Sequence, residues 1–384
     1  MTNSRIRLSI LIGLCCSAIG IVSTAVMIPG SARYSTTSAF QNPAINSPDQ
    51  FAWETFVAIN QAAKNGSNDA LWETWALQED VFSDPNKKPV WPSAEHQPKV
   101  LHPSIKLQIL LQERLERRSK QLQLFRMDVA NPVDKPKAQF IAPNPLSEEV
   151  RMNKTNFDFI VGRDLWYLEG QAAAFKDGRP FNFDPESKEV KAHWKELTNP
   201  ADKSRYHWQV GKDGKTYGLI ALHVMTKDLP NWFWATWEHV DNPERCKING
   251  CSDKFGLDPK TGQISQSLLN MFAGAGMGPE WQNYRLTGTQ TAFTDSTGRS
   301  TLLGNSQIEG RLGIMATSSC ITCHAKASVN DIGDRLDIFS AEGQSDNGSP
   351  VPTWFYNTSV SPPQMKFLQL DFEWSLGLAK PRNP

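Results

Sequence analysis

Residues 215–240 read KTYGLIALHVMTKDLPNWFWATWEHV and predict two neighbouring β-strands. Both ends of the stretch are rich in β-branched and aromatic side chains, and Lys227–Pro230 between them suits a hairpin-like connection. If the strands pair antiparallel in even register, His223 and His239 share one face of the sheet. A slip of one residue would place the two histidines on opposite faces. The chain is therefore expected to have a β-rich centre.

Helices are expected before this β-rich centre. A capping box at Ser47 precedes a helical pattern at residues 48–64, and residues 104–125 and 157–175 show further helical periodicity. Residues 284–293 alternate as a strand does. The predicted fold class is α+β, with N-terminal helices, a central antiparallel β-rich region and a small, mainly helical C-terminal segment.

The pentapeptide at residues 320–324, CITCH, is the strongest chemical signal in the chain. At the C-x-x-C-H spacing two thiols capture the vinyl groups of a haem, and the next histidine ligates its iron. The motif predicts one covalent haem c, with thioethers at Cys320 and Cys323 and His324 as the proximal iron ligand. A thioredoxin-like site would need a βαβ unit nearby, and a zinc ribbon would need a second ligand pair.

Residues 1–32 are predicted to be a signal peptide. A short polar start with Arg5 and Arg7 leads into an apolar stretch, and Gly30–Ala32 offers small residues for cleavage. Ser23–Ala25 is a competing cleavage site, and the apolar stretch is long enough to stay uncleaved as an anchor. The protein is therefore expected to be periplasmic or otherwise exported, with no stable membrane contact if the signal is cleaved.

Export also bears on the remaining cysteines of the mature chain. Cys246 and Cys251 lie in a turn-rich stretch, and thiols outside the cytoplasm tend to pair. The sequence predicts a small-loop disulfide between them, with a second metal site as the alternative.

Composition and motifs disfavour several kinds of function. The 40 basic and 40 acidic residues sum to zero, and no polybasic segment suggests nucleic-acid binding. Residues 273–279, AGAGMGP, superficially resemble a dinucleotide-binding loop, but Pro279 and Trp281 interrupt the helix that such a loop needs. The 13 tryptophans predict either an aromatic core or an aromatic-lined cavity.

Four stretches carry a resemblance to a known family: residues 189–197 (EVKAHWKEL), 218–242, the haem motif, and 370–376 (LDFEWSL). Through them the exported part resembles bacterial proteins identified only as cytochrome c family proteins. The resemblance implies covalent haem and supplies no reaction. Residues 300–384 also resemble c-type cytochromes, which place the motif at the end of an opening helix, and a capping box at Ser306–Glu309 would start that helix.

The expected organisation follows from these features. It consists of a signal peptide at residues 1–32, a linker at 33–46, an α+β domain with a Trp-rich β region at 47–299, and a cytochrome c-like haem-binding segment at 300–384.

The sixth iron ligand is the next question. Met365 follows two prolines and precedes an expected closing helix at residues 367–376, which suits the methionine ligand of small c-type cytochromes. The alternative is a core methionine. Asp371 and Glu373 are expected on a solvated or capping face of that helix rather than in acid–base chemistry.

Electron transfer is the function that the sequence favours, and a haem enzyme or sensor is the alternative. A haem ligated by Met365 would make the protein an electron carrier that exchanges electrons with a redox partner protein. An open iron site would favour a haem-dependent oxidoreductase or a small-molecule sensor, with a distal pocket lined by His223 and His239 and roofed by the Trp-rich sheet. A third possibility is that the haem is a structural staple and that the tryptophans bind a ligand.

Overall fold

A computed structural model describes most of the chain from Asn42 onward. The described residues are 42–64, 66–93, 102–103, 147–178, 180–310, 315–336 and 347–382. Contacts divide the chain into two compact units, Met1–Arg33 and Tyr34–Pro384, and all described residues belong to the second. The predicted signal peptide, most of the predicted linker and the predicted helix at residues 104–125 lie outside the described residues.

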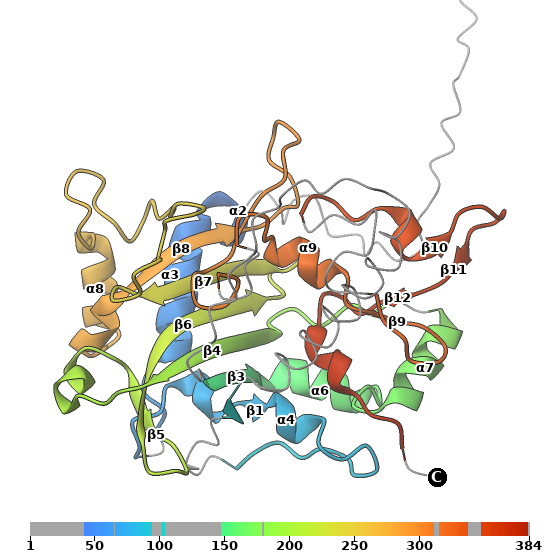
Figure 1. The fold of residues 1–384 in the computed structure, drawn as a ribbon, viewed down its shortest axis with the longest axis horizontal. Coiled ribbons are helices and arrows are strands. Elements are labelled where there is room, and N and C mark those ends of the chain that lie inside the picture. Colours follow the sequence, from blue (N-terminus) through green and yellow to red (C-terminus); the bar gives the residue numbers. More distant parts are fainter. Residues whose placement is uncertain are drawn as a thin grey trace, which may run out of the picture. The chain divides into compact units, whose positions relative to one another are not determined.

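An antiparallel β-sheet forms the centre of this second unit (Figure 1). Its eight strands are β1 (Ala76–Leu77), β2 (His102–Pro103), β3 (Ser147–Met152), β4 (Lys188–Glu196), β5 (Trp208–Val210), β6 (Thr216–Thr226), β7 (Phe233–His239) and β8 (Tyr284–Gln290). The strand order is β1-β3-β4-β6-β7-β8, while β2 pairs with β3 and β5 with β6. The α+β class and the antiparallel centre predicted from the sequence are confirmed.

The pairing of β6 with β7 decides which side chains share a face of the sheet. His223 lies opposite Thr236, and Met225 lies opposite Trp234. His239 is three residues beyond Thr236, and side chains alternate between faces along a strand, so His223 and His239 point to opposite faces. The even register in which they would share a face is therefore wrong, because the observed pairing differs from it by one residue.

Two helices, α3 (Pro48–Asn60) and α8 (Gln266–Gly274), pack on the face of the sheet that carries the Trp237 side chain, which we call the first face. The opposite face, which carries Trp234, is the second face. Trp53 and Phe56 of α3 contact Trp237 of β7, with ring centroids 6.1 and 5.2 Å apart. All 13 tryptophans fall within the described residues, and ten of them are buried. The tryptophans thus mainly build the core, and aromatic burial of this kind stabilises the fold strongly.

The other described α-helices are α2 (Pro43–Asn46), α4 (Gln78–Val81), α6 (Lys154–Gly162), α7 (Leu168–Asp177) and α9 (Cys320–Ala325). Short 3-10 helices are η1 (Leu71–Thr74), η2 (Pro200–Ser204), η3 (Pro279–Asn283), η4 (Pro352–Trp354) and η5 (Trp374–Leu378). None of the described helices is long and apolar enough to cross a membrane.

The helix expected at residues 157–175 is two helices, α6 and α7. Asn153 caps α6 by accepting a hydrogen bond from the Asn156 backbone N–H at 3.1 Å. Asp164, at φ 60°, turns the chain between the helices, and Gly178 ends α7 in the left-handed conformation. The apolar periodicity continues through this turn, which is why the sequence pattern reads as one helix.

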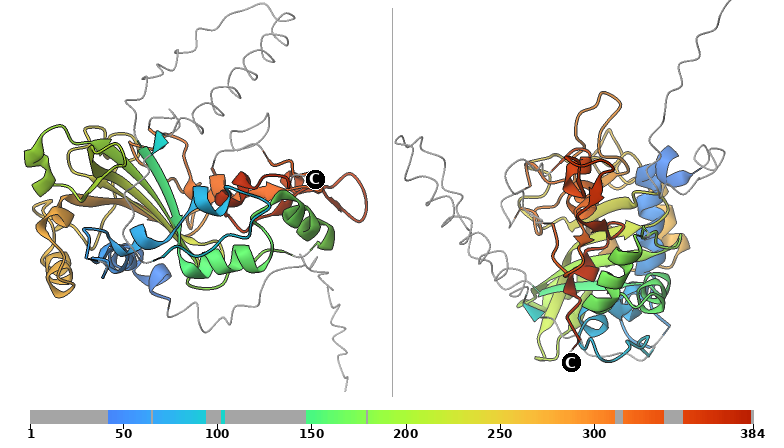
Figure 2. Two further views of the ribbon diagram at one scale, coloured as in Figure 1. Left: turned by 90° about the horizontal axis from the view of Figure 1, so that it is seen from below. Right: turned by 90° about the vertical axis from the view of Figure 1, so that its right-hand side faces the viewer.

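The C-terminal segment packs on the second face of the sheet. It contains α9 and the short strands β9 (Ser328–Val329), β10 (Tyr356–Asn357), β11 (Gln364–Met365) and β12 (Leu368–Gln369). Ile321 and Leu370 share a buried cluster with Met152 and Trp234 of the sheet. Both views of Figure 2 show this segment (red) apart from α3 (blue). The described part of the segment therefore differs from the mainly helical one expected, because turns and short strands replace most helices.

Two expected helices are not formed among these residues. Residues 306–310 are turns, in which Glu309 accepts a hydrogen bond from the Asn305 backbone N–H at 2.8 Å. Residues 367–376 contain β12, a turn and the start of η5. Glu309 thus caps a turn instead of a helix, and the Ser306 hydroxyl donates to Glu238 Oε2.

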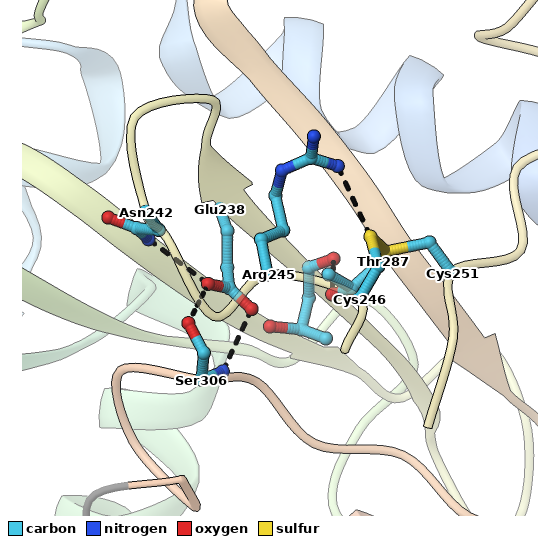
Figure 3. Close-up of a disulfide and its surroundings, with 8 residues drawn as sticks. Glu238, Asn242, Arg245, Cys246, Cys251, Thr287 and Ser306 are labelled. Atoms are coloured by element: carbon cyan, nitrogen blue, oxygen red, sulfur yellow. Dashed lines mark hydrogen bonds between the residues drawn. A yellow bond between two sulfur atoms is a disulfide. The ribbon is translucent and has the colours of Figure 1, made fainter. Parts of the chain in front are cut away.

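Cys246 and Cys251 form a disulfide, as their context predicts, with a Cα–Cα distance of 4.9 Å (Figure 3). Arg245 Nη1 donates to Cys246 Sγ at 3.2 Å. Asn249, inside the loop, donates from Nδ2 to the Met315 carbonyl at 2.6 Å. The closed loop therefore contacts the chain just before the C-x-x-C-H motif.

Removing this disulfide should have a modest effect. The double variant Cys246→Ser/Cys251→Ser is expected to lower the free energy of unfolding by about 2 kcal/mol, because a short loop loses little entropy when it is closed. Denaturant unfolding of the oxidised protein and the variant would measure it. Dithiothreitol should weaken the parent protein by a similar amount and leave the variant unchanged. An unchanged parent midpoint after verified reduction would contradict the expectation.

Candidate haem site

On helix α9, the cysteines and the histidine of the motif lie on one side, and the residues that pack in the core lie on the other. The three residues at positions i, i+3 and i+4 share one side of a helix and stay partly exposed: Cys320, Cys323 and His324. The other side is buried in the second-face core: Ile321, Thr322 and Ala325. Both motif cysteines carry thiols. The arrangement fits attachment of a haem on the accessible side.

The sheet and the C-terminal segment fix the orientation of α9. The Ile321 backbone N–H donates to Gln290 Oε1 of β8 at 3.0 Å. Trp374 Nε1 donates to the Cys323 carbonyl at 3.0 Å. Cys320 Sγ lies 3.4 Å from the Leu303 carbonyl oxygen. These contacts hold the motif from both sides.

His324 is held as a metal-ligating histidine would be. Its Nδ1–H donates to the Phe372 carbonyl at 2.8 Å, and its ring centroid lies 4.6 Å from that of Trp234. A hydrogen bond from one ring nitrogen sets the tautomer and leaves Nε2 available to a metal. Burial, above all, lowers the pKa of His324 to about 4, so the ring is neutral at neutral pH. Neutral imidazole is the form that ligates metals.

An unusual backbone presents the Phe372 carbonyl. Asp371 and Phe372 have φ values of 48° and 71°, in the left-handed region that non-glycine residues rarely adopt. Lys227 Nζ binds Asp371 Oδ1 at 2.6 Å, and the Phe183 backbone N–H donates to Asp371 Oδ2 at 2.7 Å. Strained residues persist only where their surroundings enforce them, and they gather at functional sites. The buried Lys227–Asp371 pair provides that enforcement.

Asp371 is buried, not solvated as expected, and only 7% exposed. Burial raises the pKa of Asp371 to about 6 although Lys227 acts to lower it. Burial likewise lowers the pKa of Lys227 despite the carboxylate. Both groups are therefore costly to keep charged, which makes each dependent on the other.

Glu373 is also buried, and it caps η5 by accepting from the Ser375 backbone N–H at 3.2 Å. The capping expectation is thus met and the solvated one is not. Asn156 Nδ2 donates to Glu373 Oε2 at 2.8 Å. Burial, above all, raises the pKa of Glu189 well above its usual value. The charge of Glu373 and a hydrogen bond with Glu373 act in the same direction. Burial and the neighbouring Glu373 carboxylate thus both favour the protonated form of Glu189.

Polar side chains follow His324 along the second face of the sheet. Trp234, which contacts His324, belongs to one row of side chains, and the next row contains Thr236, His223 and Lys191. Neighbouring positions on one face of a strand are about 7 Å apart. Lys191 and His223 also perturb the pKa of His324. The second row is therefore close to the motif.

The two basic side chains of the second row, Lys191 and His223, each have a carboxylate partner. Lys191 Nζ lies 3.0 Å from Glu148 Oε2, and His223 Nε2 lies 3.3 Å from Glu309 Oε2. Burial alone would raise the pKa of Glu309, but His223, the Asn305 N–H and Lys191 lower it to about 2. The side chains of Lys191 and His223 keep 26% and 16% exposure. Sequence reasoning missed Lys191 and Glu309, because Lys191 stands at a polar position of the alternating pattern in EVKAHWKEL and so resembles an ordinary exposed strand residue.

His239 lies on the other face and is not brought to His223 or the motif. Its ring stacks on Tyr206 at 3.7 Å, and Nε2 donates to the Arg205 carbonyl at 3.0 Å. The Asp241 backbone N–H donates to Nδ1 at 3.2 Å. Both nitrogens are used in the neutral form, so His239 is a structural histidine. Of the two predicted pocket histidines, only His223 lies beside the motif.

Met365 lies on β11, opposite Tyr356 of β10. Its partly buried side chain packs against the same apolar cluster as Cys320. Met365 and Cys320 therefore border a common core, and the closing helix expected after Met365 is replaced by β12 and a turn.

Comparison with known proteins does not identify this site. No protein-family model, curated protein or solved structure matches the chain. Within the described residues, no group of three or more His, Cys, Asp or Glu side chains is arranged to hold a metal ion. The predicted similarity to cytochrome c family proteins therefore stays a prediction.

The Lys227–Asp371 pair can be tested by its effect on stability. Asp371→Asn is expected to lower the free energy of unfolding by about 3 to 5 kcal/mol, because the Lys227 ammonium stays buried without its counter-charge. Denaturant unfolding would measure the change.

The matched control is Glu244→Gln, which removes an exposed pair with Lys247 at 2.8 Å, where the side chains are 60% and 58% exposed. This control should cost less than about 1 kcal/mol. If both variants lost a similar free energy of unfolding, the buried pair would contribute no more to stability than an exposed pair.

His239 predicts a pH dependence of stability. Burial, above all, lowers its pKa to about 4, compared with about 6.5 for a solvated histidine. The unfolded chain therefore binds more protons between these values, so stability falls as pH drops from about 6.5 to about 4. Each pKa unit corresponds to about 1.4 kcal/mol, so this residue contributes about 3 kcal/mol to that loss.

His239→Gln should reduce the slope of the free energy of unfolding against pH in this window, whatever its effect at neutral pH. Unfolding titrations of both proteins at several pH values would measure the slopes. Identical slopes would mean that His239 is not kept neutral by the fold.

Proposed function

We propose that this chain is an exported c-type haem protein with one haem, attached through Cys320 and Cys323 and ligated by His324 Nε2. The observation that carries the proposal is the hydrogen bond from His324 Nδ1 to the Phe372 carbonyl. That bond sets the tautomer that leaves Nε2 for iron. The haem-binding segment would be residues 300–384, with the motif on α9 as in c-type cytochromes.

The roles of the protein residues follow from their contacts. When bound, the haem supplies an iron that changes between two oxidation states and can take a sixth ligand. Cys320 and Cys323 would hold the porphyrin by thioether bonds, while Phe372 orients the imidazole. Trp234 packs against the His324 ring and limits its rotation.

We propose that this haem acts on a small molecule and exchanges electrons with a redox partner protein in the periplasm. The partly exposed row of Lys191 and His223 beside the motif supports this function, because polar donors next to a haem suit ligand binding. Balanced charge gives no reason to propose a nucleic-acid partner.

A second candidate function is electron transfer by a six-coordinate haem. Met365 supports it, since its side chain packs on the same apolar cluster as Cys320. In that case Met365 would complete the iron coordination, and Met365→Ala would convert a low-spin haem to a high-spin haem.

Absorption spectra of the haem-loaded protein, with and without carbon monoxide, would decide between these functions. The proposed function predicts a ferrous haem that takes carbon monoxide at once, and a spectrum that Met365→Ala leaves unchanged. A low-spin haem that binds carbon monoxide only after Met365→Ala would establish the electron carrier instead.

Covalent attachment has a separate test. Haem staining should persist on a denaturing gel for the parent protein and disappear for Cys320→Ser/Cys323→Ser. The parent protein should be found in the periplasmic fraction after expression with residues 1–32. A stain that is absent from the parent protein after expression with the haem-attachment machinery would overturn the proposal.

A further inference from the structure

We infer that the second face of the sheet holds a small anionic ligand of the haem iron through hydrogen bonds from Lys191. The inference rests on the proposed function, because it needs the iron. It adds the class of ligand and the protein group that selects it. The ligand would be an anion of a few atoms, such as azide or nitrite, that bonds to iron at one end.

Position is the first argument. Lys191 of β4 lies directly opposite His223 of β6, and His223 lies opposite Thr236 of β7. The row that they form follows the row of Trp234, whose ring contacts His324. A ligand that bonds to iron held by His324 on this face would therefore come within reach of the row.

The hydrogen-bonding capacity of Lys191 is the second argument. An ammonium group has three N–H donors. Among the described residues, Lys191 Nζ has one bonded acceptor, Glu148 Oε2 at 3.0 Å, and its side chain keeps 26% exposure. The remaining donors are free to bind an anion, and the long side chain can move its charge toward it.

The nearby carboxylates are already engaged, so they oppose an anion less than their number suggests. Glu148 Oε2 also lies 3.1 Å from His193 Nε2, in addition to Lys191. Glu309 Oε2 accepts from the Asn305 backbone N–H at 2.8 Å and lies 3.3 Å from His223. The carboxylates orient the donors and leave Lys191 as the accessible charge.

The test is azide binding to the ferric, haem-loaded protein, followed by its absorption change. Lys191→Met should weaken azide binding by about tenfold or more, the effect of losing a hydrogen bond that involves a charged group. Carbon monoxide binding to the ferrous protein should change by less than about threefold, because that ligand is uncharged and accepts hydrogen bonds poorly. Lys191→Arg keeps the charge and should retain most of the azide affinity.

Lys195→Met is the matched control, since Lys195 is on the same strand and its Nζ donates to Tyr206 OH at 2.7 Å, away from the motif. Its azide affinity should equal that of the parent protein. Equal azide affinities for the parent and Lys191→Met proteins would overturn the inference, as would a parent haem that binds no azide. Haem staining of each variant separates these outcomes from failure of the proposed function, which would appear as absent haem.

Discussion

The buried ion pair between Lys227 and Asp371 is the interaction on which the geometry of the motif depends. It joins the start of the β6–β7 connection to the turn that carries Phe372, and the Phe372 carbonyl orients His324. Both groups are almost fully buried, with 2% and 7% exposure. Two charges in such a place offset each other's desolvation only if both are present and well aligned. The pair therefore fixes the position of the turn at Asp371 and Phe372 rather than acting as a general source of stability.

The ion pair is needed because the strained backbone of this turn requires an external restraint. Two consecutive non-glycine residues, Asp371 and Phe372, adopt left-handed conformations that cost of order 1–3 kcal/mol each. A relaxed turn would move the Phe372 carbonyl away from His324. The surrounding contacts, from Phe183 and Lys227, hold the carbonyl where the imidazole can donate to it. The strain is thus confined to the point where the chain meets the motif.

Local sequence patterns predicted the parts of the molecule that depend on neighbouring residues. The strands around residues 215–240 and the disulfide of Cys246 with Cys251 are examples, since each follows from nearby composition. The register of β6 with β7 was not predictable, because it depends on how each face packs against distant segments. The burial of Asp371 was missed for the same reason, since its partner lies 144 residues earlier in the chain. His223 was found because it is a histidine, whereas Lys191 looks like an ordinary exposed strand residue until the sheet is assembled.

The two faces of the sheet differ in polarity, and this difference bears on the role of the polar second face. On the first face, neighbouring positions of β4 and β6 are apolar and buried: Val190, Ala192, Leu222 and Val224. On the second face, Lys191, His193 and His223 stand at the alternating positions, beside carboxylates. Apolar residues there would avoid the desolvation penalty, and replacing buried ion pairs by apolar side chains is often neutral or stabilising. Stability therefore does not explain the polar face. A requirement for polar groups beside His324 does, because departures from the pattern that folds best are expected where a protein performs its function.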